Sequence, residues 1–374
     1  MVPEILRRKM TKFKRSFLTA FIVAVAIVAV SYTDVPACSR ILWCPEGQPV
    51  LVGRNMDWTE RMGTVLYTMP KGIARQGMTK TNPMKWTSKY GSVIAAVWDS
   101  ASTDGMNEAG LSANLLYLAE TDYGKLDPSK KGLSVSIWSQ YFLDNFATVA
   151  EAVEAVPSIQ IRTFELVHHG KKVGAPIHIS LADATGDSAI IEILDGKPVV
   201  HHGKEFKVMT NSPTYDEQLV LLKQYDGLGG KKPLPGSAEA DDRFVRAAYY
   251  LTKLPEKPSS YQEAVAGVLS VLRNAATPIG YNDPKAPNVS ATQWRTISDL
   301  TNKRYYFELT NAPNVVWVDL DKMNLAKGAP VLAFDLASDI EASGDVSGKF
   351  TTVKPLEFQA EGTAVTWKPQ SKSR

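Results

Sequence analysis

Residues 35–57 read VPACSRILWCPEGQPVLVGRNMD, and this stretch decides the fold. Two apolar runs, Ser39–Trp43 and Val50–Asp57, flank a Pro-Glu-Gly-Gln turn, so the segment predicts a β-hairpin. The first strand begins next to Cys38. The second strand ends in Gly-Arg-Asn-Met-Asp-Trp (residues 53–58), which the hairpin brings back beside that cysteine.

The segment before Cys38 has the pattern of a removable export signal. Residues 1–16 carry six Lys or Arg side chains, residues 17–30 are an apolar and small run, and Val-Pro-Ala supplies small residues at the −3 and −1 positions of a cleavage site. We therefore expect a signal peptide over residues 1–37, export to the periplasm or the medium, and a mature chain that begins at Cys38.

Three other interpretations of this region stay open. The apolar run is a transmembrane anchor only if about 14 residues suffice, whereas a span needs about 20, so we expect no stable membrane anchor. Cys38 is a lipidation site in a second interpretation, although Val35 and Pro36 make a poor lipobox. In a third, Cys38 forms a disulfide with Cys44, because exported chains lie where disulfides form.

A cysteine at the start of a mature chain combines a nucleophile and a base in one residue. Its thiol attacks, and its free α-amine, with a pKa of about 7.7–8.0, accepts and returns the proton. This is the chemistry of N-terminal nucleophile hydrolases, and it makes Cys38 the first catalytic candidate.

Composition narrows the function classes. The full chain of 374 residues has 42 basic and 39 acidic residues, but residues 38–374 have 36 and 37, so we expect no nucleic-acid partner. We also expect no cofactor and no metal, because the five histidines do not have the spacing of a chelating cluster. They are His168, His169, His178, His201 and His202.

Strand and helix patterns follow one another in blocks. Residues 92–98 and 110–118 read as buried strands around an Asp104-Gly105 turn, and residues 133–156 read as one helix. A four-stranded meander is predicted over residues 176–211. Helices over 240–254 and 261–275 and a hairpin over 304–320 complete the pattern.

This order of elements predicts the α+β class. Hairpins rather than regular strand–helix alternation favour antiparallel sheets covered by helices. We expect a four-layer αββα sandwich of two antiparallel sheets, the fold of N-terminal nucleophile hydrolases, as one domain over residues 38–374.

Four further residues are candidates for the chemistry around Cys38. Arg54 and Asp57 supply a cation and a carboxylate at the end of the second strand, although a surface salt bridge is the simpler interpretation. Asn211, before Ser212-Pro213, is a donor for an oxyanion or a turn residue. Arg243 lies at the start of an amphipathic helix, where a solvated face residue is the normal interpretation.

The ordered set of motifs resembles the choloylglycine hydrolase family, most of all its Gram-negative penicillin V acylase branch, over essentially the whole mature chain. The motifs are Cys38-Ser-Arg40, Gly53-Arg-Asn-Met-Asp-Trp58, Asp104-Gly-Met-Asn-Glu-Ala-Gly-Leu111, Thr210-Asn-Ser-Pro213, Asp242-Arg-Phe-Val-Arg-Ala247 and Trp294-Arg-Thr-Ile-Ser-Asp299.

The resemblance implies a role for each catalytic candidate. Cys38 is the nucleophile, Arg54 the arginine beside its sulfur, and Asp57 the carboxylate that binds the amine. Asn211 supplies the oxyanion-hole amide, and Arg243 supports the charge network.

The resemblance also implies a substrate pocket and an assembly. Tyr117, Trp58 and Met56 are expected to line the pocket, with the two rings suited to a phenoxyacetyl or fatty acyl group. Tyr117 also gives a backbone N–H to the oxyanion hole. The family implies a homotetramer.

The predicted function is an amidase that cleaves a linear carbon–nitrogen bond through a thioester. The expected substrate is a small-molecule amide such as penicillin V or an N-acyl-homoserine lactone. A conjugated bile salt hydrolase is the first alternative, and a secreted lipoprotein anchored at Cys38 is the alternative without enzymatic activity.

Overall fold

The computed structural model describes residues 38–168, 171–281, 283, 289–312 and 314–365. The predicted signal peptide, residues 1–37, and His169 lie outside these residues. In the described part of the chain, no helix is long and apolar enough to cross a membrane.

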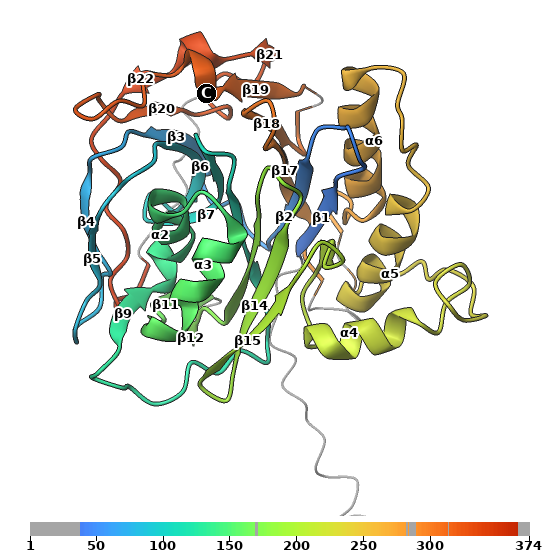
Figure 1. Ribbon diagram of the computed structural model, residues 1–374, viewed down its shortest axis with the longest axis horizontal. Helices are drawn as coiled ribbons and strands as arrows, with labels where there is room; N and C mark the ends of the chain where they lie inside the picture. Colours follow the sequence, from blue (N-terminus) through green and yellow to red (C-terminus); the bar gives the residue numbers. More distant parts are fainter. Residues whose placement is uncertain (1–37, 169–170, 282, 284–288, 313, 366–374) are drawn as a thin grey trace, which may run out of the picture. The chain divides into compact units, whose positions relative to one another are not determined.

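Two large sheets form the centre of the fold (Figure 1). The seven-stranded sheet has the order β16 (Val208–Met209), β1 (Cys38–Trp43), β2 (Leu51–Asp57), β17 (Thr292–Asp299), β18 (Arg304–Leu309), β19 (Val316–Asp319) and β21 (Gly344–Asp345). The nine-stranded sheet has the order β15 (Lys197–His202), β14 (Ser188–Leu194), β13 (Ile177–Ala182), β8 (Ser112–Tyr117), β7 (Ala101–Asn107), β6 (Ser92–Val97), β3 (Val65–Met69), β20 (Leu332–Phe334) and β22 (Thr351–Thr352).

Three strand pairs lie outside the two large sheets. They are β4 (Ala74–Gln76) with β5 (Lys85–Thr87), β9 (Lys131–Ser134) with β10 (Ile159–Arg162), and β11 (Glu165–His168) with β12 (Lys171–Gly174). Pairing within the large sheets is antiparallel except between β19 and β21.

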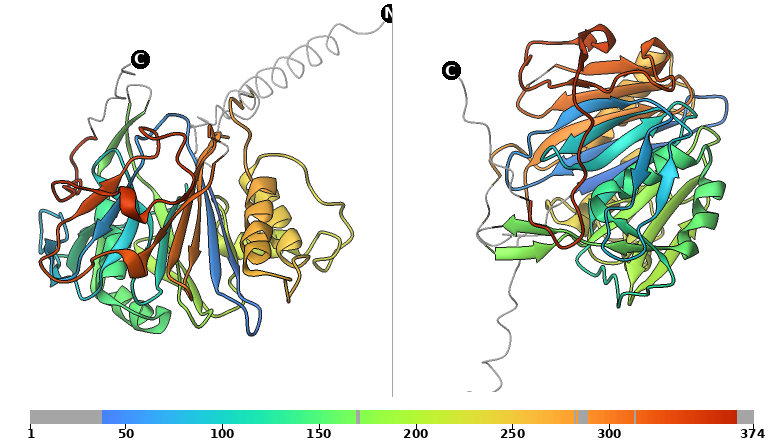
Figure 2. Two further views of the ribbon diagram at one scale, coloured as in Figure 1. Left: turned by 90° about the horizontal axis from the view of Figure 1, so that it is seen from above. Right: turned by 90° about the vertical axis from the view of Figure 1, so that its left-hand side faces the viewer.

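Helices cover the outer face of each large sheet. Helices α2 (Trp138–Asn145) and α3 (Val149–Ala155) pack on the nine-stranded sheet, and α5 (Ala240–Leu251) and α6 (Tyr261–Asn274) pack on the seven-stranded sheet (Figures 1 and 2). Helix α4 (Tyr215–Leu222) packs beside α5. The predicted α+β sandwich with αββα layers is confirmed.

Strands β1 and β2 are buried along their whole length because one face meets α5 and α6 and the other meets the second sheet. Such strands read as continuous buried runs. Gly53 allows the close approach of α6: a Cβ at this position would lie 2.7 Å from Leu272 Cδ1. This double cover removes the polar side chains of both strands from water.

The predicted turn at Asp104-Gly105 is wrong. Both residues lie inside β7, and the chain instead turns at Trp98 and Asp99, which have φ values of 54° and 49°. An Asp-Gly pair is a strong local turn signal, but here each residue serves a contact made at long range. Gly105 is required because a Cβ would lie 2.6 Å from the Val93 carbonyl oxygen.

The single helix predicted over residues 133–156 is divided. The chain forms β9, a 3-10 turn at Val135–Ile137, then α2 and α3. Thr148 ends the continuity, because its side chain and that of Glu151 form a capping box that starts α3 afresh. The apolar spacing that predicted one helix continues across the break.

The last strand of the predicted meander changes sheets. Strand β16 pairs with β1 rather than with β15, and Met209 lies opposite Arg40. This exchange carries Asn211 from the nine-stranded sheet to the start of β1. Neither α4 nor β17 was expected from the sequence as an element, whereas β1, β2, α5 and α6 lie where they were predicted.

The environment of Gly105 predicts a stability cost. Gly105→Ala should lower the free energy of unfolding by about 1–3 kcal/mol, because the added methyl group would overlap Val93 O and Leu143 Cδ1. Urea unfolding of the purified protein measures this value. Gly236→Ala is the matched control, since nothing lies within 4 Å of its Cβ position. A Gly105→Ala protein as stable as this control would contradict the packing argument.

Candidate active site

Cys38 is the first residue of β1 and pairs with Met56 on β2. Opposed residues on neighbouring strands project to the same face, so Cys38, Met56 and Arg54 all face the space between the two sheets. Cys38 Sγ lies 3.9 Å from Arg54 Nη2 and 3.8 Å from Met56 Sδ. The strand register therefore places a buried guanidinium beside the thiol.

Asp57 projects from the opposite face of β2, toward the helices. Thr292 on β17 donates a hydrogen bond of 2.5 Å to Asp57 Oδ1. Arg243 on α5 brings Nη1 to 3.6 Å from Asp57 Oδ2 and donates from the same nitrogen to Cys38 O and Ser39 Oγ, each at 2.6 Å. The backbone of Cys38 thus lies between the arginine on each face of the sheet.

Asn211, just beyond β16, completes the surroundings of the Cys38 nitrogen. Its Oδ1 accepts hydrogen bonds from the Cys38 backbone N–H and, at 2.9 Å, from Arg243 Nη2. Its Nδ2 donates to Tyr117 O at 2.7 Å. An amide nitrogen has two hydrogens, so one remains for a further acceptor.

One oxygen of the Asp57 carboxylate accepts no hydrogen bond. Among the residues that the structure describes, Asp57 Oδ2 has no hydrogen-bond donor although Asp57 is fully buried, and the charge of Arg243, with Nη1 at 3.6 Å, compensates it. This oxygen can therefore accept a hydrogen bond from a further donor.

Burial raises the pKa of both titrating groups of the site. It raises the pKa of the Cys38 thiol, with Arg54 as the strongest opposing influence. It also raises the pKa of Asp57 to about 6, against the lowering effects of Arg243 and the Thr292 hydrogen bond. At neutral pH Asp57 is therefore mostly ionised, and Cys38 is a thiol rather than a thiolate.

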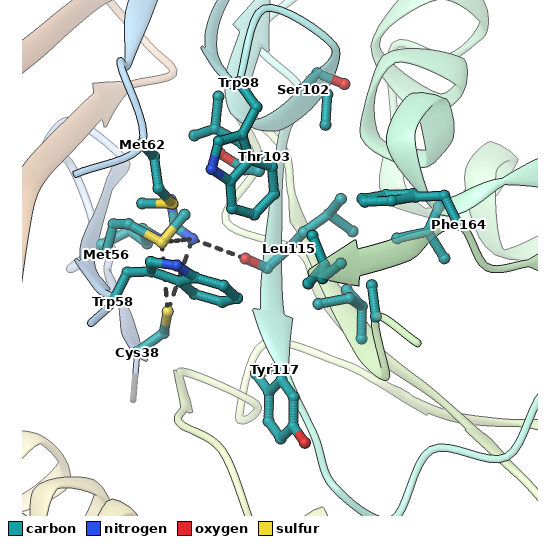
Figure 3. A pocket seen from close by; sticks show the side chains of 17 residues that line it. Cys38, Met56, Trp58, Met62, Trp98, Ser102, Thr103, Leu115, Tyr117 and Phe164 are labelled. Carbon is teal, nitrogen blue, oxygen red and sulfur yellow. Dashed lines mark hydrogen bonds between the residues drawn. The ribbon is translucent and has the colours of Figure 1, made fainter. Parts of the chain in front are cut away.

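An apolar cavity opens beside Cys38 (Figure 3). Trp58 and Trp98 meet edge to face in its wall, with ring centroids 5.4 Å apart. The rest of the lining comes from both sheets and from residues near β11. It includes Arg54, Met56, Met62, Ser102, Thr103, Leu115, Tyr117, Val135, Phe164, Leu166, Ala175 and Ile177.

The structure brings all of the predicted site residues together. Arg54, Asp57, Asn211 and Arg243 surround Cys38 and are at most 1 % exposed. Met56, Trp58 and Tyr117 line the cavity. Cys38 and Cys44 are free thiols in the structure, so the alternative of a disulfide between them is not realised.

Several residues of this site received no predicted site role, although Ser39 and Asp104 lie within the quoted motifs. They are Ser39, Met62, Trp98, Asp104 and Thr292. Thr292 lies two residues before the Trp294 motif, and a threonine in a strand carries no local sign of a distant carboxylate. In the described part of the chain, no group of three or more His, Cys, Asp or Glu side chains could hold a metal ion.

Comparison with known proteins gives concordant matches. Residues 38–340 match the linear amide C–N hydrolases of the choloylglycine hydrolase family. The chain is 43% identical to a penicillin V acylase of Pectobacterium atrosepticum, over 86% of this chain and 92% of that protein. It is 26% identical to a bile salt hydrolase/transferase of Clostridium perfringens, over 74% and 90%.

A solved structure agrees with these matches. The structure of penicillin V acylase from Agrobacterium tumefaciens superposes with a TM-score of 0.79 at 44% identity. The superposition covers 86% of this chain and 100% of that one.

The Thr292 hydroxyl predicts a measurable shift in the titration of Asp57. Thr292→Val removes the donor to Oδ1 but keeps the shape of the side chain, so the pKa of Asp57 should rise above about 6. Carboxyl ¹³C chemical shifts of aspartate-labelled protein between pH 4 and 8 report the midpoint. Thr310→Val is the control, because no residue that the structure describes bonds to its buried hydroxyl. An unchanged Asp57 midpoint would show that the hydroxyl does not stabilise the carboxylate.

Proposed function

The chain belongs to the choloylglycine hydrolase family of linear amide C–N hydrolases, and from this premise we propose that Cys38 is its nucleophile and that its substrates carry apolar acyl groups. One observation carries the proposal. Arg54, Asp57, Asn211 and Arg243 converge on a buried cysteine beside an apolar cavity.

Cleavage after Ala37 would convert the Cys38 nitrogen into an α-amine that acts as the base. The amine takes the proton of the thiol as sulfur attacks the amide carbonyl carbon. The tetrahedral intermediate then breaks its C–N bond, the amine gives its proton to the leaving nitrogen, and a thioester remains. Next, the amine takes a proton from water as the water oxygen attacks the thioester. The C–S bond then breaks, the amine returns this proton to sulfur, and the carboxylic acid is released.

The neighbouring residues divide the other tasks. Asn211 Oδ1 and Asp57 orient the amine, and Arg243 fixes both of them and the Cys38 carbonyl. Arg54 stabilises negative charge on sulfur. The remaining Nδ2 hydrogen of Asn211 and the backbone N–H of Tyr117 form the oxyanion hole.

Penicillin V and N-acyl-homoserine lactones are the substrates that this cavity suits best. Apolar side chains, two of them tryptophans, offer burial to a phenoxyacetyl ring or an alkyl chain at about 25 cal/mol per Å². Relatives described as penicillin V acylases support the first substrate. Hydrolysis of the second would silence acyl-homoserine lactone signals, a quorum-quenching activity.

Bile salt hydrolysis is the second candidate because relatives at lower identity carry that name. The cavity argues against it. Its lining is mostly apolar side chains. Hydroxyl groups of a bile steroid that are buried against these side chains would lose water without gaining partners, which costs about 1–3 kcal/mol each.

Export and assembly complete the proposal. We propose a periplasmic or secreted protein that forms a homotetramer. The lipoprotein alternative fits poorly, since Cys38 is only 2% exposed. The intact mass of the purified protein distinguishes a lipidated Cys38 from an unmodified one. A diacylglyceryl group on Cys38 would end the nucleophile assignment.

Activity should depend on processing at Ala37. A protein that begins at Cys38 should hydrolyse penicillin V, whereas one that retains residues before Cys38 should be inactive, because its Cys38 nitrogen is an amide and not a base. Cys38→Ser should lose nearly all activity, since a hydroxyl is far less acidic than a thiol. Amine release, with N-terminal sequencing of each sample, tests this. Full activity in a protein that begins upstream of Cys38 would refute the mechanism.

The cavity predicts the order of substrates. The kcat/KM for penicillin V or a long-chain acyl-homoserine lactone should exceed that for glycocholate. Tyr117→Asn should lower the kcat/KM for penicillin V and for the acyl-homoserine lactone by about tenfold, because the ring no longer packs against the acyl group. Tyr117→Phe is the matched control and should leave both kcat/KM values unchanged. A preference of the wild-type protein for glycocholate would reassign the substrate while leaving Cys38 as nucleophile.

A further inference from the structure

The Arg54 guanidinium lies between Cys38 and a second charged residue, Asp104. Arg54 Nη2 faces Cys38 Sγ at 3.9 Å and donates to Leu115 O at 2.8 Å. Arg54 Nη1 lies 3.8 Å from Asp104 Oδ2. Both charged side chains are fully buried, so neither finds compensation in water.

Asp104 is itself held from two directions. Asn114 Nδ2 donates to Oδ2 at 2.7 Å, and the Tyr305 hydroxyl donates to Oδ1 at 2.6 Å. Asn114 lies on the neighbouring strand β8, whereas Tyr305 reaches across from β18 of the other sheet. The carboxylate is thus fixed between the sheets before any substrate is present.

Few contacts determine where the Arg54 guanidinium points. Within the described residues its Nε and Nη1 have no hydrogen-bond partner. Its direction is fixed by Leu115 O, by Met56 Sδ 3.4 Å from Nη2, by the Trp294 ring 4.5 Å from the guanidinium carbon, and by the charge of Asp104. Of these four, only Asp104 supplies the opposite charge that a buried cation needs.

We propose that Asp104 is a positioning residue for the nucleophile: its carboxylate, fixed by Tyr305 and Asn114, holds the Arg54 guanidinium against Cys38 Sγ. The inference rests on the proposed function in that Cys38 is taken as the nucleophile. Asp104 is not among the cavity-lining residues and reaches Cys38 only through Arg54. Its removal should therefore change the thiol rather than substrate contacts.

The test measures the thiol directly, in the protein that begins at Cys38. The rate of Cys38 alkylation by iodoacetamide is recorded from pH 5 to 10 for the wild type, Arg54→Met, Asp104→Asn and the double variant. Loss of Arg54 should move the alkylation midpoint to higher pH by about one pH unit or more, because a neighbouring cation favours the thiolate. Asp104→Asn should move it in the same direction by less.

The double variant distinguishes positioning from an independent effect. If Asp104 acts through Arg54, adding Asp104→Asn to Arg54→Met should leave the midpoint where Arg54→Met put it. The double variant should also unfold at a higher urea concentration than Arg54→Met. Arg54→Met alone leaves the buried Asp104 carboxylate without its counter-charge. Additive shifts, no shift in Asp104→Asn, or a shift to lower pH would each overturn the proposal.

Two adjacent tyrosines allow a comparison in which only a hydroxyl group is removed and no charge is changed. Tyr305→Phe removes one donor to Asp104 and should shift the alkylation midpoint upward, in the direction of Asp104→Asn. Tyr306→Phe, whose hydroxyl instead meets Tyr261 OH at 2.9 Å, should leave it unchanged. Equal effects of the two variants would contradict a specific role for Tyr305.

Failure of this inference is separable from failure of the proposed function. If Cys38→Ser keeps the amidase activity, the nucleophile assignment fails, whatever the alkylation data show. If Cys38→Ser is inactive but Asp104→Asn leaves the thiol profile unchanged, only the positioning role fails.

Discussion

The register between β1 and β2 is the constraint on which the site depends. Because Cys38 lies opposite Met56, residues 54 and 56 share its face and Asp57 takes the other. A slip of one residue would exchange these faces and separate the thiol from its cation. Burial on both sides makes such a slip costly, so the packing that stabilises the sheet also fixes the chemistry.

The buried charges around Cys38 occur as opposed groups. Arg54 faces Asp104 between the sheets, and Arg243 faces Asp57 under the helices. A buried ion pair adds little net stability, but one partner alone is strongly destabilising. The two pairs are therefore better understood as the groups that set the charge around Cys38, compensated by the apolar core around them, than as a source of stability.

The sequence predicted the parts of the fold that have a local signal. The β1–β2 hairpin, α5 and α6 have clear periodicity, and the motif order identified Cys38, Arg54, Asp57, Asn211 and Arg243. Asp104 was read as a turn residue because its partners, Tyr305 and Arg54, are distant in sequence. Thr292 and Trp98 were missed for the same reason: their roles arise from contacts that only the folded chain creates.

Strand β7 joins two regions with different requirements. Its start, after the turn at Trp98, forms cavity wall, whereas Asp104 must keep its place against Arg54. Between them the pairing with β6 shifts at Thr103, because Ala95 opposes Asp104 but Ala96 opposes Ser102. A bulge of this kind bends the strand and re-aims its side chains. Ser102 and Thr103 can therefore line the cavity while Asp104, next along the same strand, lies against Arg54.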